Sequence, residues 1–341
     1  MPRSRSAEKK DNNQGYGSAS GSAPGTGTGS AAGTGSAAGT GSAAGTGSGS
    51  AAPDAAKLER GKYVATITGC VMCHTPIGPQ GPDMTRAYGG GMEIEEDFGT
   101  WISPNITPDP DTGIGTWTDA EIIAAIRDGK RKDGTMIKMI MPYMFYAGMT
   151  DDDAGALVAF LRSVPPVVNK VGRGDLKLPD MPAPPIPRVD DTSDPVKHGQ
   201  YLTGLMHCAM CHTPFGPQGP DLSKMWAGGF EMKLPPMFGT GSLWSSNITS
   251  HPETGIGKWT EADIVAAVRV GVRPDQRPIL GPMSFYLPLW SQVTDADAKA
   301  IAAFVKSIPP IDNKVPASTF KPAGPPPGGP PPPGGTPPPA K

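Results

Sequence analysis

The sequence predicts an all-α protein built from two tandem domains of one design, each with long loops. Two segments, CVMCHTPIGPQGPD at 70–83 and CAMCHTPFGPQGPD at 208–221, are nearly identical and contain all 4 cysteines. Further along, residues 105–129 return at 247–271 and residues 151–170 return at 295–314, while strand signals are nearly absent. Because the copies keep their order and their offset drifts only from 138 to 144 residues, the repeat is a whole domain rather than a short motif.

Composition separates the domains from their connections. The chain has 46 glycines and 42 prolines in 341 residues, and they are unevenly spread. The Gly, Ala, Ser and Thr run near the start buries too little apolar surface to offset the entropy of ordering it. The proline-rich stretches favour extended polyproline II conformations. We therefore expect a disordered segment at 1–56, domains at 57–170 and 194–314, a proline-rich linker at 171–193 and a disordered tail at 315–341.

Each domain is expected to contain three main helices. The first starts near Lys57 or Asp194 and runs into the cysteine motif. The second follows a long Gly-rich loop and begins after a threonine with an acidic first turn, a common helix start. The third begins in the same manner and ends before a Pro-Pro pair. The cap residues of these helices are Thr118 and Thr150 in the first repeat, Thr260 and Thr294 in the second.

The first helix is expected to cross closely over the last one. Glycine stands at Gly61 and Gly199, and bulky rings stand at Phe160 and Phe304 of the last helices. A residue without a side chain lets two helix backbones approach.

The cysteine motif allows three interpretations. Cys-x-x-Cys-His is the attachment signature of c-type haem, in which two thiols form thioethers and the histidine binds iron. A redox dithiol needs no such histidine and favours a βαβ setting. A zinc site needs four converging ligands, whereas each half carries its own complete helix pattern. The motif therefore predicts two covalent haems, attached at Cys70, Cys73, Cys208 and Cys211, with His74 and His212 on the irons.

Each repeat resembles a class I cytochrome c domain over Lys57 to Lys170 and Asp194 to Lys314. It is most similar to the domains of multihaem cytochrome subunits of membrane-bound alcohol dehydrogenases and of small dihaem cytochromes. The resemblance rests on CVMCHTP and CAMCHTP, on FGT before NIT, on TGIGTW and TGIGKW, and on the final helix before Pro-Pro. The distal loop reads MPY in the first repeat but PMSFY in the second, a departure from the family pattern.

The resemblance implies a methionine as the second axial ligand, in the loop before the last helix. A thioether is a soft, neutral ligand that raises the potential of the iron. Alignment of MPYMFY with MSFYLP pairs Met141 with Met283, and Met283 is the only methionine of its loop. Met139 is the alternative to Met141, because most of the 16 methionines are expected to be flexible core residues.

Two expectations concern the remaining polar groups. His198 and His251 have no histidine at the matching positions of the first repeat, so both are expected at the surface. The proline-rich turn after each motif histidine is expected to offer a backbone carbonyl to its Nδ1–H, which would orient the ring.

With both axial positions filled, the expected function is one-electron transfer through two bound haems, without catalysis of bond chemistry. The expected partners are redox proteins, with a dehydrogenase as donor and an oxidase or cytochrome as acceptor. The formal net charge of -2 counts against a general nucleic-acid binder. Two alternatives stay open: an electron-accepting subunit of a dehydrogenase complex, and a dihaem enzyme for peroxide or thiosulfate with one open iron.

The resemblance also implies an exported, periplasmic protein, because covalent haem is normally attached outside the cytoplasmic membrane. The basic start, MPRSRSAEKKDNN, is followed by no apolar stretch, so no signal peptide is visible in this sequence. An N-terminal signal or anchor outside this sequence would then account for export and for association with a membrane.

Overall fold

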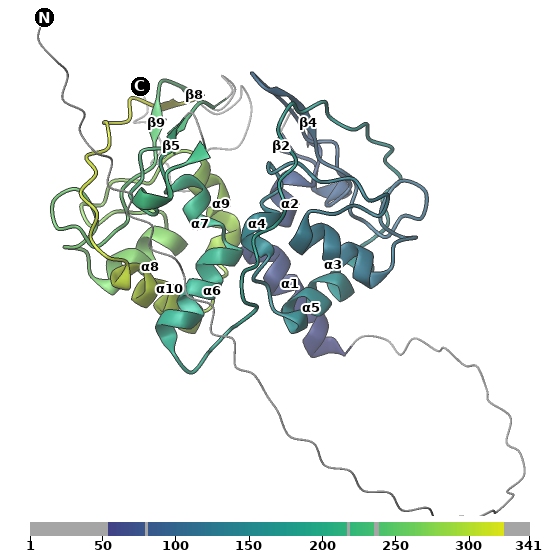
Figure 1. Ribbon diagram of the computed structural model, residues 1–341, viewed down its shortest axis with the longest axis horizontal. Coiled ribbons are helices and arrows are strands. Elements are labelled where there is room, and N and C mark those ends of the chain that lie inside the picture. Colours follow the sequence, from purple (N-terminus) through teal and green to yellow (C-terminus); the bar gives the residue numbers. More distant parts are fainter. Residues whose placement is uncertain (1–53, 79–80, 217–218, 235–238, 324–341) are drawn as a thin grey trace, which may run out of the picture. The chain divides into compact units, whose positions relative to one another are not determined.

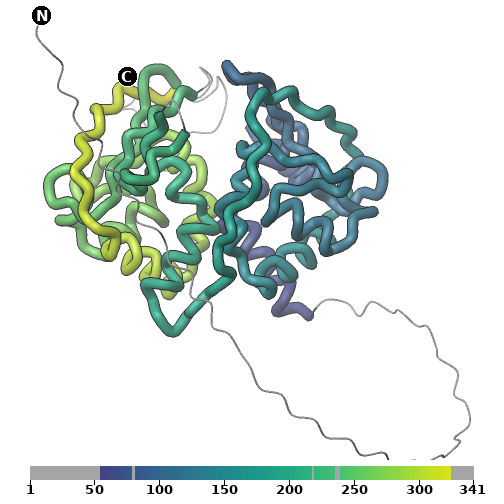
Figure 2. The backbone as a smooth tube through the Cα atoms, in the orientation of Figure 1, coloured from purple at the N-terminus to yellow at the C-terminus, as the bar shows by residue number. Residues whose placement is uncertain are grey.

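The computed structural model describes residues 54–78, 81–216, 219–234 and 239–323 (Figures 1 and 2). All of them belong to one compact unit. The predicted disordered segment lies outside the described residues except for 54–56, and so does the tail from residue 324 onward.

The first repeat consists of five helices and four short strands among the described residues. The helices are α1 (Ala55–Ile67), α2 (Cys70–Cys73), α3 (Asp119–Asp128), α4 (Tyr143–Tyr146) and α5 (Asp151–Ser163), with a 3-10 turn η1 at Met84–Arg86. The strands form two antiparallel hairpins, β1 (Ile77–Gly78) with β2 (Gly81–Pro82) and β3 (Glu93–Glu96) with β4 (Gly99–Ile102).

The second repeat follows the same order within the part of the chain that is described. Its helices are α6 (Pro195–Leu205), α7 (Cys208–Cys211), α8 (Glu261–Arg269), α9 (Pro282–Trp290) and α10 (Asp295–Ser307), with η2 at Leu222–Lys224. Its strands are β5 (Phe215–Gly216), β6 (Gly219–Pro220), β7 (Glu231–Met232), β8 (Gly239–Thr240), β9 (Leu243–Trp244) and β10 (Lys321–Pro322). The predicted all-α class with two matching domains is confirmed.

The helix starts are fixed by the predicted threonines. Thr118 and Thr260 form capping boxes with Glu121 and Asp263, in which each side chain bonds to the backbone N–H of the other residue. Thr150 and Thr294 cap α5 and α10 in the same way without the reciprocal bond. The same short signal therefore starts the same helices in both repeats.

Close crossing of the first and last helices builds each core, as predicted. A methyl group on Gly61 would lie 1.9 Å from the carbonyl oxygen of Ala156, and one on Gly199 would lie 1.9 Å from that of Ala300. Figure 1 shows the pairs α1 with α5 and α6 with α10, which pack against each other. The buried side chains around these crossings include Val64, Ile67, Leu157, Leu161, Leu202, Leu205, Ile301 and Val305.

The linker lies along the first repeat without helix or strand (Figure 2). Its backbone carbonyls accept hydrogen bonds from side chains of the distal loop: Tyr143 Oη donates to Met181 at 2.7 Å and Lys138 Nζ donates to Leu178 at 2.7 Å. The linker therefore holds this loop in place.

Two features differ from the sequence expectation. The strands of the hairpins are two to four residues long, too short to leave an alternating pattern in the sequence.

The tail was expected to be solvated from residue 315, but residues 315–323 are described and β10 pairs with β8. Phe320 is only 8% exposed, and a methyl group on Gly239 would lie 2.6 Å from its ring. The strand pairing and the burial of this aromatic side chain together hold the segment against the second repeat.

Candidate haem sites

The four cysteines lie on two single-turn helices. Cys70 and Cys73 are the first and last residues of α2, and Cys208 and Cys211 those of α7. An i, i+3 spacing in a helical turn places both thiols on one face. None of the four forms a disulfide.

The cysteine environments do not resemble a redox dithiol. Burial raises the pKa of Cys73 and Cys211 to about 11 and that of Cys208 to about 12, and it also raises the pKa of Cys70. A redox-active cysteine needs the opposite shift, because the thiolate is the reactive form. A zinc site is not supported either, since among the described residues no three His, Cys, Asp or Glu side chains gather as a metal cluster.

The two motif histidines are oriented by backbone carbonyls. Nδ1 of His74 lies 2.8 Å from the carbonyl oxygen of Pro104, and Nδ1 of His212 lies 2.8 Å from that of Ser246. A carbonyl can only accept, so each Nδ1 carries the proton and donates it. Burial lowers the pKa of both rings. Each neutral imidazole therefore keeps a lone pair on Nε2, which has no hydrogen-bond partner among the described residues.

The carbonyls come from a different segment than predicted. The turn after each histidine was expected to supply them, but they lie 30 and 34 residues further on, directly before Asn105 and Asn247. The proline-rich segment after each histidine forms a short hairpin, β1 with β2 or β5 with β6, and supplies no carbonyl to the histidine. The expectation about the turn was wrong because the partner is set by tertiary packing.

The repeated NIT sequence holds these carbonyls in position. Nδ2 of Asn105 donates to the carbonyl of Val167 at 2.7 Å, and Oδ1 accepts from the backbone N–H of Thr107 at 2.9 Å. Asn247 makes the matching bonds to Ile311 and Thr249 at 2.8 and 3.0 Å. Each asparagine thus ties the histidine-orienting loop to the chain after the last helix, a role that the sequence alone did not reveal.

The predicted methionines occupy matching places before the last helix. Met141 directly precedes the Pro142 cap of α4, whereas Met283 is the second residue of the longer helix α9. Both side chains pack against the hydrophobic core. Met149, which lies just before the last helix, is fully buried and stands where the second repeat has Val293, so it is a packing residue.

Each repeat thus presents two thiols on one face, an imidazole with a free Nε2 lone pair and a thioether in the segment before the last helix. This donor set fits a c-type haem. The cytochrome c family model matches residues 58–165 and 196–309. The chain belongs to the cytochrome c family. Its two domains carry two c-type haems, so it is a dihaem cytochrome c.

Several curated relatives of this cytochrome c are similar over most of its length. It is 35% identical over 292 residues to the cytochrome c subunit of an alcohol dehydrogenase (quinone) from Gluconacetobacter polyoxogenes, covering 79% of this chain and 60% of the relative. It is 33% identical over 267 residues to a dihaem c-type cytochrome from Cereibacter sphaeroides, covering 74% of this chain and 86% of the relative. The cytochrome c subunit of a gluconate 2-dehydrogenase from Pantoea cypripedii is 31% identical over 270 residues, 74% of this chain and 60% of the relative.

The chain therefore spans about three fifths of the length of the dehydrogenase subunits that it matches. Within the described residues, no helix combines the length and apolar character needed to cross a membrane.

The two repeats contact each other through a reciprocal polar cluster. Tyr201 Oη donates to Oδ2 of Asp153 at 2.5 Å, and Tyr63 Oη donates to Oδ2 of Asp297. Each tyrosine thus reaches the aspartate of the other repeat. The tyrosines stand 138 residues apart and the aspartates 144, so the two bonds are copies of one another.

The cation in this cluster differs between the repeats. Arg60 makes two bonds to Asp153, at 2.6 and 2.7 Å, whereas His198 bonds through Nε2 to Asp297 and through Nδ1 to Asp190, each at 2.7 Å. The His198 side chain is 12% exposed, so the expected surface position was wrong. The reason is that it replaces an arginine at the contact between the repeats.

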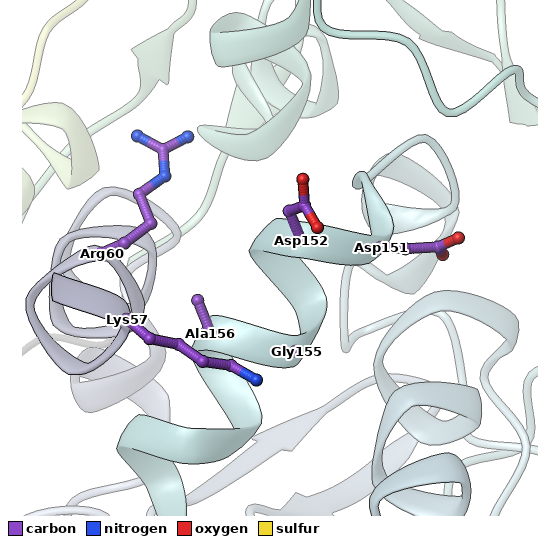
Figure 3. A pocket seen from close by; sticks show the side chains of 6 residues that line it. All are labelled: Lys57, Arg60, Asp151, Asp152, Gly155 and Ala156. Carbon is purple, nitrogen blue, oxygen red and sulfur yellow. The ribbon is translucent and has the colours of Figure 1, made fainter. Parts of the chain in front are cut away.

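Arg60 also borders a pocket between α1 and α5 (Figure 3). Lys57, Asp151 and Asp152 line the same pocket, which none of the four cysteines borders.

His207, directly before Cys208, is a residue whose role the sequence analysis missed. It has a left-handed backbone, with φ of 44°, where the first repeat has Gly69 with φ of 71°. Its ring lies against Tyr146 and Tyr286. The sequence did contain a signal for this role, because the second repeat has histidine where the first has glycine, directly before the first cysteine of the motif.

Proposed function

We propose that each repeat holds its own haem with His/Met ligation and that the protein relays single electrons. Cys70 and Cys73 would attach one haem, between His74 and Met141. The second haem would be attached at Cys208 and Cys211, with His212 and Met283 as its ligands. The observation that carries the proposal is the Nε2 lone pair of each buried, neutral histidine, kept available by the bond from Nδ1 to a carbonyl.

When bound, the two haems would supply one-electron chemistry, and the side chains that hold them would tune its potential. The Nδ1–H bond fixes the tautomer and strengthens the basicity of each imidazole. Met141 and Met283 would supply thioethers, which favour the reduced state, and both side chains pack against the apolar core. With His74, Met141, His212 and Met283 holding the irons, no ligand position would remain for a substrate, which would suit a carrier rather than an enzyme.

We further propose that the electron donor is a dehydrogenase and that the protein acts outside the cytoplasmic membrane. Two of the relatives named above are cytochrome c subunits of dehydrogenases that act on an alcohol or on gluconate. An oxidase or another cytochrome would then accept the electrons. Co-purification of the chain from its native membranes with a dehydrogenase supports this assignment, and recovery of the chain alone from gently solubilised membranes contradicts it.

The ligand assignment is tested by two matched methionine variants. Met141→Ala removes the proposed thioether and is expected to abolish the methionine-to-iron absorption of one haem, while Met139→Ala leaves it unchanged. Loss of the band in Met139→Ala with retention in Met141→Ala contradicts the assignment. Met283→Ala is expected to remove the band of the other haem.

The carrier function is tested on the resting protein. Both irons are expected to be low-spin, with no turnover of peroxide or thiosulfate. A high-spin iron together with turnover of either substrate contradicts the proposal and indicates a dihaem enzyme with one open site.

A further inference from the structure

A row of aromatic rings crosses the contact between the repeats. Tyr146 lies edge-on to His207 at 6.4 Å between ring centroids, and His207 lies edge-on to Tyr286 at 5.6 Å. Tyr286 stacks on Trp290 at 4.8 Å and 24°. We call these four side chains the aromatic seam. Tyr146 belongs to the first repeat and the other three belong to the second, so the seam joins the two.

The seam is anchored on the end of α1, next to the first cysteine motif. Oη of Tyr146 donates to the carbonyl of Thr68 at 3.1 Å, and Nε1 of Trp290 donates to that of Ile67 at 3.2 Å. The last carbonyls of a helix lack partners within the helix, so these bonds satisfy them. One residue from each repeat thus closes the same helix end.

Gly69 brings the ring of Tyr286 against the chain beside Cys70. A methyl group on Gly69 would lie 2.4 Å from Cε1 of Tyr286, closer than atoms can approach. The glycine also has a left-handed backbone, which few other residues adopt without strain. The second repeat fills the matching position with the ring of His207, which contacts Tyr286. A run of contacts therefore leads from Cys70 through Gly69, Tyr286 and His207 to Cys208.

Tyr286 lies beside both cysteine motifs, against Gly69 and His207. Burial raises the pKa of its phenol. Its hydroxyl makes no hydrogen bond with a described residue, so the ring makes the contacts. Burial also lowers the pKa of His207 to about 4, which keeps this ring neutral and suited to aromatic packing.

We infer that Tyr286 and His207 are positioning residues that hold the two haem-binding segments together and set the rate of electron exchange between the domains. The inference rests on the proposed attachment at Cys70 and Cys208. Each exchange moves one electron from the reduced domain to the oxidised one, and no bond is formed or broken and no proton moves. Packed rings keep dispersion contacts between the two segments, whereas a void forfeits them and lets the segments separate. Electron exchange slows as that gap widens.

The test compares Tyr286→Leu with Tyr286→Phe in the full chain. NMR of the half-reduced protein reports the exchange rate from the broadening of the haem-methyl signals. Phenylalanine keeps the ring and is expected to exchange within about twofold of the unchanged protein, while leucine slows exchange by roughly tenfold. Intact mass and visible spectra of both variants are expected to show two haems with unchanged ligands, and amide hydrogen exchange to show an intact α1.

Two results with the Tyr286 variants overturn the inference. One is a leucine variant that keeps both haems and exchanges at the unchanged rate. The other is a phenylalanine variant as slow as leucine, which assigns the effect to the hydroxyl. If the leucine variant loses a haem, His207→Gly decides the question: slow exchange supports the seam and unchanged exchange refutes it. An unchanged protein carrying fewer than two haems contradicts the proposed function instead, and intact mass shows this before any exchange is measured.

Discussion

The two repeats use the same tyrosine and aspartate at their contact but a different cation, and the difference decides how each half responds to pH. Arg60 stays charged at any accessible pH. Both nitrogens of His198 lie 2.7 Å from carboxylate oxygens, which can only accept, so this ring must carry two protons. Although burial opposes it, the bonds to Asp297 and Asp190 raise the pKa of His198. The duplication therefore produced one permanent ion pair and one that titrates.

The largest expected effect is a loss of unfolding free energy that is greater for the Asp153 variant than for the Asp297 variant. Asp153→Ala removes the acceptor of Arg60 and Tyr201, and the guanidinium keeps its charge, so we expect a loss of about 2–4 kcal/mol in the free energy of unfolding. Asp297→Ala at pH 8 is expected to cost less, about 1–2 kcal/mol, because His198 can release its proton. Denaturant unfolding followed by circular dichroism measures both. Equal losses at pH 8 contradict this difference between the cations.

The next effect concerns the position held by Gly69 in one repeat and His207 in the other. In Gly69→Ala the new methyl group must fit a left-handed backbone and would also clash with the ring of Tyr286. Gly134→Ala is the matched control, because Gly134 has φ of 81° and nothing within 4 Å of an added methyl group. The left-handed conformation costs each variant about 1–2 kcal/mol. We expect Gly69→Ala to lose about 1–3 kcal/mol more from overpacking. Equal unfolding free energies would show that Tyr286 does not press on this site.

The smallest effect tests the titrating pair itself. A raised folded pKa means that the pairing of His198 stabilises the protein fully below its unfolded pKa of about 6.5 and is lost as pH rises through the folded value. His198→Arg copies the first repeat and is expected to remove this alkaline loss. Unfolding free energies measured from pH 6 to pH 9 compare the two proteins. A variant with the same slope as the unchanged protein shows that another group titrates.

Local signals in the sequence predicted most of each domain, and tertiary contacts account for the rest. The threonine caps, the Pro-Pro stops and the Cys-x-x-Cys-His spacing act over a few residues, so the helices and their cysteines could be inferred directly. The carbonyl that orients His74 comes from 30 residues away, and no short pattern announces it. The burial of His198 likewise depends on a partner 99 residues away. The placement of residues 315–323 depends on the pairing of β10 with β8 and on the burial of Phe320.

Comparison of the repeats themselves carried more information than either repeat alone. Positions that match, such as Gly61 with Gly199, have structural roles that could be predicted from one copy. Positions that differ, such as Arg60 with His198 and Gly69 with His207, lie at the contact between the copies. At these two positions the difference between the copies marks a contact between the domains.

The central claim is that each repeat binds its own haem through its own cysteine pair. Intact mass spectrometry of the mature, denatured protein tests it most directly, together with the paired variants Cys70→Ser/Cys73→Ser and Cys208→Ser/Cys211→Ser. The account predicts two covalent haems in the unchanged protein and one in each paired variant. Thiols free of haem in the mature protein, or a paired variant that keeps two covalent haems, would contradict it.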